Sequence, residues 1–234
     1  MTDAANYFEY IDKYCERTVQ GLWGEPLNVI SNVAFLIVFL LLLKYFYHNF
    51  HGRYRKNWDI AALIFLIFCL TLGSTAWHVF AVRWALFTDI IPILIFINLF
   101  MVSCFFRVLN RKLIGVIALF GFYQLFNYLI QRQFSIETLN GSIFYLPVVI
   151  YLFGITLFVS QFRQDLHWYY LASTSIFTVA LTLRTFDMSQ CDSFPAGTHF
   201  LWHTFIAIVL YLLTMSLMMS KSIKVDANID FDKK

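Results

Sequence analysis

The chain has 234 residues, of which 60% are hydrophobic, 20% aromatic and 13% charged. Soluble proteins carry about 25% charged residues, so a water-soluble fold of this length is excluded, as are disordered and collagen-like chains. The formal net charge of +3 comes from 17 basic and 14 acidic residues, which are scattered among short connecting segments. They form no basic face, and nucleic acid is therefore not an expected partner.

Seven segments are long and apolar enough to cross about 30 Å of hydrocarbon as helices. They are residues 26–43, 60–82, 84–106, 113–131, 138–162, 166–183 and 193–220. Strands of a membrane barrel would be about 10 residues long and only half apolar. The expected fold class is therefore all-α, an integral membrane protein with a bundle of seven transmembrane helices.

Three parts are expected along the chain: an acidic N-terminal segment (1–25), a membrane domain (26–220) and a cytoplasmic tail (221–234). The first part has the wrong charge and polarity for a cleavable signal peptide. An odd number of spans puts the termini on opposite sides, and the N-terminal side then holds five of the 17 Lys and Arg residues against twelve on the other. This bias predicts a cytoplasmic C-terminus and an N-terminus on the outer side.

Four ionisable residues near the ends of the spans are candidates for a functional site: His78, Asp89, His199 and His203. Such groups cost several kcal/mol in hydrocarbon unless they are partnered. At 1.5 Å rise per residue, the predicted topology puts all four within roughly 3 to 10 Å of the outer helix ends. His199 and His203 are four residues apart and share one helical face. The four side chains are expected to meet at one depth.

Three imidazoles from two helices are typical of a catalytic zinc site, because the fourth tetrahedral position stays open for water. Zinc there lowers the pKa of water and polarises a carbonyl, as hydrolysis of an amide or ester requires. Asp89 is expected beside the site as hydrogen-bond acceptor and general base. Ser74 lies one turn before His78 and is a candidate donor to an oxyanion.

Each of these residues also has a simpler structural interpretation. Intramembrane His and Ser side chains commonly bond a neighbouring helix or a carbonyl of their own helix. A haem bound between His78 and either His199 or His203 is a competing cofactor.

Two further pairs are predicted outside the spans. Arg184 and Asp187, three residues apart at the end of the sixth span, are expected to form a local ion pair. Cys15 and Cys191 both fall on the outer, oxidising face. A disulfide between them is predicted to join the N-terminal segment to the loop before the last span.

Three separated signatures carry a resemblance that covers nearly the whole chain. They are Cys15-Glu16 followed by Glu25-Pro-Leu-Asn28-Val-Ile-Ser31-Asn32, Gly73-Ser74-x-x-x-His78 followed by Asp89 and Pro92, and Gly197-x-His199-x-x-x-His203. In this order they resemble the alkaline ceramidases, whose superfamily includes the progestin and adiponectin receptors. The resemblance implies zinc (Zn²⁺) on His78, His199 and His203, assistance from Asp89 and Ser74, and an amide-linked sphingolipid as substrate.

The resemblance also implies a calcium (Ca²⁺) site in the N-terminal segment. The family places an acidic residue just before an aromatic-Cys-Glu run and an Asn shortly after it, where this chain has Lys13 and Thr18. Glu16 and Glu25 match the pattern, and Asp12 stands one residue from the acidic position. These three residues are the candidate calcium ligands.

The sequence therefore predicts a zinc-dependent intramembrane amidase that splits a ceramide-like lipid into a fatty acid and a long-chain base. Ile90 stands where the family often has a second acidic residue, which leaves the substrate more open than the metal. One alternative is a hydrolase of another acyl lipid, because the zinc chemistry is shared. The other is a zinc-containing lipid receptor or sensor without turnover, although the adiponectin-type receptors have a cytoplasmic N-terminus.

Overall fold

The computed structural model describes residues 6–135 and 137–227, with side chains described as far as Ser220. Within these ranges the regular elements are helices, so the predicted all-α class is confirmed. The α-helices are α1 (Pro26–Ser31), α2 (Val33–Phe50), α3 (Trp58–Phe80), α4 (Arg83–Arg107), α5 (Leu113–Gln133), α6 (Leu146–Phe162), α7 (His167–Phe186) and α8 (His199–Ala227). Short 3₁₀ turns form η1 (Tyr54–Asn57), η2 (Ser142–Tyr145), η3 (Gln164–Leu166) and η4 (Asp187–Ser189).

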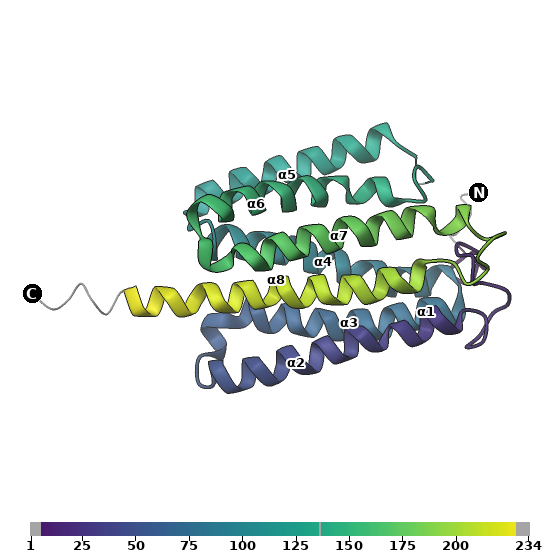
Figure 1. The fold of residues 1–234 in the computed structure, drawn as a ribbon, viewed down its shortest axis with the longest axis horizontal. Coiled ribbons are helices and arrows are strands. Elements are labelled where there is room, and N and C mark those ends of the chain that lie inside the picture. The colour runs from purple at the N-terminus through teal and green to yellow at the C-terminus, as the bar shows by residue number, and fades with distance from the viewer. Residues whose placement is uncertain (1–5, 136, 228–234) are drawn as a thin grey trace, which may run out of the picture.

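The long helices lie side by side along one axis of the molecule (Figure 1). In this view α8 runs through the middle, with α2 and α3 on one side of it and α5, α6 and α7 on the other. Buried apolar side chains from α2, α3, α4, α6, α7 and α8 form the main core, which is continuous along the bundle. The N-terminal segment and the loop before α8 meet at the same end of the bundle.

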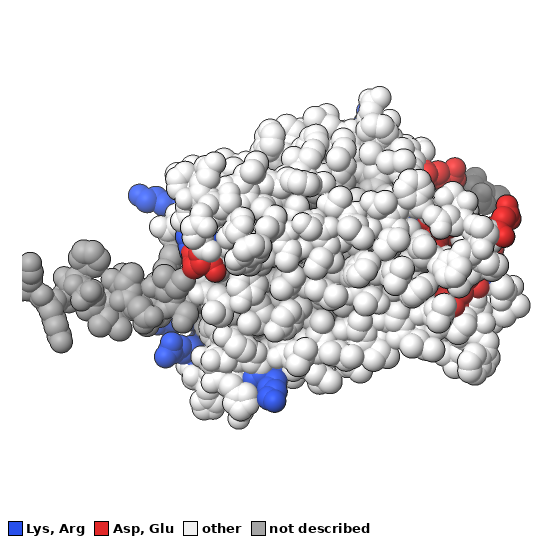
Figure 2. Space-filling model, in the orientation of Figure 1, with Lys and Arg blue, Asp and Glu red and all other residues white. Residues whose placement is uncertain are grey.

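Six helical segments are long and apolar enough to cross a membrane, among the described residues: Pro26–Phe50, Tyr54–Phe80, Arg83–Arg107, Leu113–Gln133, Ser142–Phe162 and His199–Ser220. The outer surface fits this role, because large apolar side chains such as Ile114, Phe122 and Trp168 are more than 70% exposed. Figure 2 shows a broad belt without charges between the two ends of the molecule. The chain therefore has the architecture of a multi-pass membrane protein.

The α7 helix corresponds to the sixth predicted span but is less apolar than the other six, because it contains many Ser and Thr residues. Several of these hydroxyls bond inside the helix: Ser173 donates to the Tyr169 carbonyl at 2.7 Å and Thr185 to the Leu181 carbonyl at 2.7 Å. Although α7 is less apolar, the Ser173 and Thr185 hydroxyls therefore add no unpaired hydrogen-bond donor to it.

Two helices begin later than predicted because the chain turns before them. The fifth span, expected from residue 138, starts at η2 because Leu139, Asn140 and Gly141 adopt left-handed backbone conformations with φ of 53°, 53° and 73°. The last span, expected from 193, starts at His199 after the left-handed Gly197. At its other end α8 continues to Ala227, into the expected tail, whose residues 228–234 lie outside the described part of the chain.

Candidate metal centre

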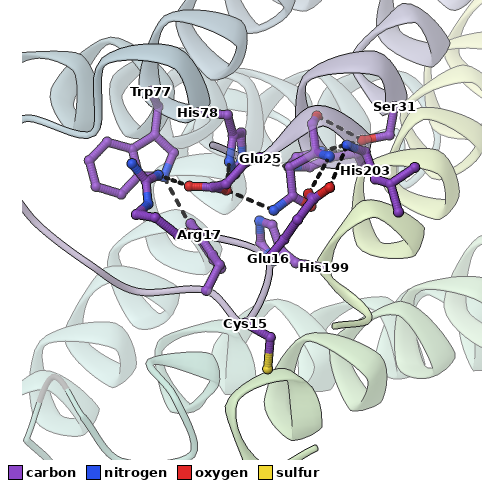
Figure 3. Close-up of polar contacts among 12 residues, drawn as sticks. Cys15, Glu16, Arg17, Glu25, Ser31, Trp77, His78, His199 and His203 are labelled. Carbon is purple, nitrogen blue, oxygen red and sulfur yellow. Dashed lines mark hydrogen bonds and ion pairs between the residues drawn. The ribbon is translucent and has the colours of Figure 1, made fainter. Parts of the chain in front are cut away.

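The three histidines predicted as zinc ligands meet at the end of the bundle that carries the N-terminal segment (Figure 3). His78 lies near the end of α3, while His199 and His203 lie in the first turns of α8. One ligand nitrogen from each ring lies within 4.8 Å of the other two, and all three residues are at most 3% exposed. The predicted juxtaposition of these three side chains is confirmed.

Hydrogen bonds on the outer sides of two rings decide which nitrogens face the centre. His78 Nδ1 lies 2.5 Å from Glu25 Oε2 and donates its proton to this carboxylate. The Ser31 hydroxyl donates to the Asn28 carbonyl at 2.9 Å, so its oxygen accepts from His203 Nδ1 at 2.8 Å. Each ring then carries a lone pair on Nε2. These two Nε2 atoms face each other at 3.1 Å.

Two lone pairs that converge in a buried site repel each other unless a cation lies close to both. Two nitrogens bound at about 2.0–2.1 Å to a tetrahedral zinc ion would be about 3.3 Å apart, close to the 3.1 Å between these Nε2 atoms. His199 Nδ1 is buried without a hydrogen-bond partner in the described part of the chain, as expected of an atom reserved for a ligand. The donor set therefore fits a metal ion, and imidazole nitrogens suit zinc as well as other transition metals.

A close approach of α3 and α4 brings Ser74 beside Asp89. A Cβ atom on Gly73 would lie 1.9 Å from the Thr88 carbonyl oxygen, so the helices touch where only glycine fits. The next residue, Ser74, lies on the same cavity wall as Asp89. Asp89 is not part of the converging histidine group, which agrees with a place beside the metal.

A cavity of about 820 Å³ opens from the histidines into the bundle. Ser74, Asp89, His199 and His203 all contribute to its wall. The cavity lies within the size range of ligand sites. Its other walls combine apolar and polar side chains, among them Ile93, Ile97, Ile206, Tyr123, Asn127, Gln131, Lys13, Glu137 and Arg184.

The predicted calcium ligands Asp12, Glu16 and Glu25 do not form a metal-binding group among the described residues. The Glu16 carboxylate accepts two backbone N–H groups at the start of α1, at 2.6 and 2.8 Å. The Glu25 carboxylate contacts the Arg17 guanidinium as well as His78. Burial raises the pKa of Glu25 to about 7, and Arg17 is the strongest influence in the opposite direction. Asp12 lies on the cavity wall.

A disulfide joins Cys15 to Cys191, as predicted, across 176 residues of sequence. Beside it, the buried Asp187 carboxylate accepts hydrogen bonds from the backbone N–H groups of Thr198 at 2.6 Å, His199 at 3.0 Å and Cys15 at 3.2 Å. Asp187 therefore caps the first turn of α8 and ties the N-terminal segment to the helix that carries two of the three histidines.

The predicted ion pair between Arg184 and Asp187 is wrong. Asp187 follows the last residue of α7 and turns towards α8. Arg184 instead donates from Nη1 to the Asn140 carbonyl at 2.7 Å and lies over the Trp202 ring, 5.6 Å from its centre. The three-residue spacing would favour a pair only if the helix continued through both residues.

Five contacts at this site have no counterpart in the sequence-based predictions. They are the Glu25–His78 hydrogen bond, the Arg17–Glu25 pair, the Ser31–His203 hydrogen bond, the Asp187 cap, and the stacking of Tyr14 on His199 at 3.9 Å between ring centres. One signal was present, because Arg17 is a basic residue in the acidic segment that also carries the three predicted calcium ligands.

No protein-family model and no curated protein matches this chain. The functional conclusion therefore depends on the geometry of the histidines, of Asp89 and Ser74, and of the cavity that they line.

Proposed function

We propose that this protein is a zinc-dependent intramembrane amidase that hydrolyses the amide bond of a ceramide-type lipid. The observation that carries this proposal is the convergence of the His78 and His203 lone pairs beside a lipid-sized cavity, with Ser74 and Asp89 on the cavity wall. A buried histidine cluster with a carboxylate nearby and a large cavity beside it is a typical active-site arrangement. The resemblance to the alkaline ceramidases supplies the substrate class.

The residues of the site divide the chemistry among themselves. His78, His199 and His203 would hold the metal, and bound zinc would supply the Lewis acidity that polarises the amide carbonyl and makes a nearby water more acidic. Asp89 accepts a proton from the attacking water and returns it to the departing amine nitrogen, so that a fatty acid and an amine leave. Ser74, on the same cavity wall as Asp89, would donate a hydrogen bond from its hydroxyl group to the oxyanion.

The cavity has a polar end and an apolar end, as a ceramide-like substrate has. Lys13, Glu137 and Arg184 line the end near the loops, where a hydroxylated head group would find hydrogen-bond partners. A smaller apolar pocket of about 50 Å³, lined mainly by residues of α4, α6, α7 and α8, shares the wall residues Ile93 and Ile206 with the cavity. This neighbouring pocket suits part of a hydrocarbon chain.

The topology proposed for the enzyme has seven spans, with α7 as the seventh membrane helix, the N-terminus outside and the C-terminus in the cytoplasm. Two observations support it: α7 lies alongside α6 and α8 (Figure 1), and several of its hydroxyls bond within the helix. Figure 2 shows Lys and Arg side chains mainly at the end where the C-terminus leaves, and acidic side chains mainly at the other end. Reporter fusions at both termini test this topology, which fails if both report the same side.

The activity is tested with purified protein in lipid nanodiscs, by elemental analysis together with a substrate panel of ceramides, other N-acyl lipids and acyl esters. We expect about one zinc per chain and release of fatty acid from ceramides, with little release by Asp89→Asn. Cleavage of esters or other amides alone would favour a different acyl-lipid hydrolase. Stoichiometric zinc without any turnover would favour a receptor or sensor, and a haem absorption band would replace the zinc proposal.

A further inference from the structure

We infer that Arg17 is a built-in cation of the metal centre, a positioning residue that holds Glu25 against His78. The Arg17 and Glu25 side chains are both fully buried and in contact, and Glu25 in turn accepts from His78 Nδ1 at 2.5 Å. Figure 3 shows that Glu25 contacts both Arg17 and His78. The inference rests on the proposed metal centre and adds to it a residue from the N-terminal segment.

The two oxygens of Glu25 have different partners. Oε1 faces the Arg17 guanidinium, whereas Oε2 accepts from His78 Nδ1 at 2.5 Å and from Asn28 Nδ2 at 2.7 Å. The carboxylate is therefore held from both sides, and its orientation fixes the proton of His78 on Nδ1. A histidine ligand held in this way by a carboxylate presents its other nitrogen to the metal in a fixed direction.

A carboxylate buried this deeply needs a positive partner, because an unpaired buried charge costs several kcal/mol. A guanidinium suits this place better than an ammonium, because it is always charged and its planar fork can stack on aromatic rings. The Arg17 guanidinium lies 5.3 Å from the centre of the Trp77 ring and 5.9 Å from that of Tyr10. Arg17 is thus fixed by its neighbours as well as by Glu25.

The backbone around Arg17 is fixed as well. Cys15, two residues before Arg17, is bound to Cys191, and the adjacent Glu16 accepts hydrogen bonds from N–H groups at the start of α1. The guanidinium contacts Oε1 of Glu25, which is one of the predicted calcium ligands. We therefore expect the positive charge in this segment to come from the chain itself, with no need for a bound divalent cation.

The test compares zinc affinity in three variants of the full-length protein: Arg17→Gln, Arg17→Lys and, as a matched control, Arg83→Gln. Arg83 pairs with Glu9 in the same way, but at the surface, with both side chains more than a third exposed. Zinc affinity is measured by competition with a chelator, and ligand geometry by the visible spectrum of the cobalt(II)-substituted protein. Neither readout involves turnover, so an inactive but zinc-loaded wild type would contradict the proposed function and leave this inference standing.

We expect Arg17→Gln to lower zinc affinity by about 10- to 100-fold, the usual effect of losing a partner of a metal ligand, and to change the cobalt spectrum. Arg17→Lys should recover part of the zinc affinity and part of the wild-type cobalt spectrum. Arg83→Gln should match the wild type in both readouts. Calcium or a calcium chelator should shift neither the zinc affinity nor the melting temperature of the wild type.

Wild-type zinc affinity and an unchanged cobalt spectrum in folded Arg17→Gln would overturn the inference. A wild type whose zinc affinity or melting temperature changes with calcium would overturn it as well. If Arg17→Gln does not fold, the double variant Arg17→Gln with Glu25→Gln takes its place in the test, because it removes both buried charges together. Zinc affinity in that double variant equal to the wild type would overturn the inference equally. A wild type that binds neither zinc nor cobalt would overturn it together with the metal centre.

Discussion

The Nε2 atoms of His78 and His203 face each other at 3.1 Å, although 125 residues separate them in the sequence. The Nδ1 atoms of both rings donate outwards, one to Glu25 and the other to Ser31, so both lone pairs point to one place. A cation at this place is therefore favoured by the electrostatics of the site, beyond the mere presence of three histidines. This relationship gives the metal predictions a physical basis.

Replacing His203 by Ala should remove zinc and activity together. The change deletes one of the two facing nitrogens, and a site with two ligands binds zinc weakly. The matched control is His48→Ala, an exposed histidine on α2. Elemental analysis after gel filtration should find zinc depleted in the first variant only. Full zinc content in folded His203→Ala would show that His203 is not a ligand.

Asp89→Asn should keep zinc and lose turnover. Asn has nearly the same size and can still accept a hydrogen bond, but it cannot take a proton from water. We expect hydrolysis to fall by at least about 10²-fold, the scale typical of losing a general base. Initial rates with saturating lipid and a parallel zinc assay separate the two effects. A rate within a few fold of the wild type would remove Asp89 from the mechanism.

Ser74→Ala should lower the hydrolysis rate. The loss should be smaller than that of Asp89→Asn if Ser74 mainly orients Asp89, and larger if the Ser74 hydroxyl also donates to the oxyanion. The expected loss lies between about 10-fold and 10³-fold, the upper value being that of an oxyanion donor. Zinc content should stay unchanged, because Ser74 is outside the histidine group. Turnover equal to that of the wild type would leave Ser74 only a packing role.

Gly73→Ala should destabilise the protein, whereas Gly154→Ala should not. A Cβ at Gly73 meets the Thr88 carbonyl at 1.9 Å and pushes α3 away from α4, while a Cβ at Gly154 meets nothing within 4 Å. We expect the first change to cost up to about 3 kcal/mol and the second to add up to about 1 kcal/mol through reduced chain entropy. Melting temperatures in detergent should therefore move in opposite directions. Equal melting temperatures would contradict the close contact at Gly73.

Asp187→Ala should loosen the start of α8. It leaves the buried N–H groups of Thr198 and His199 without their carboxylate partner, a loss of about 2 kcal/mol or more. Asp192→Ala, an exposed residue of the same loop, is the control. We expect a lower melting temperature and weaker zinc binding for Asp187→Ala alone. Identical unfolding curves for both variants would exclude the cap.

The sequence alone determined the features that depend on local spacing. Apolar stretches of about 20 residues predicted the membrane helices, and the four-residue interval between His199 and His203 predicted one shared helical face. The common depth of His78 and the α8 pair followed from counting residues from the helix ends. The disulfide between Cys15 and Cys191 followed from placing both cysteines on the outer, oxidising face. These features depend on spacing and on the side of the membrane assigned to each segment, and both can be read from a single sequence.

Only the tertiary structure decided which side chains pair. Arg184 was expected to bind Asp187, its neighbour in sequence, but Asp187 bonds α8 and Arg184 bonds the loop before α6. Likewise, the partner of His78 is Glu25, 53 residues away, and Glu25 contacts Arg17 where the sequence suggested calcium. A buried charge takes whichever countercharge the packing of the helices brings within contact, and that packing depends on contacts between distant residues such as Gly73 and Thr88.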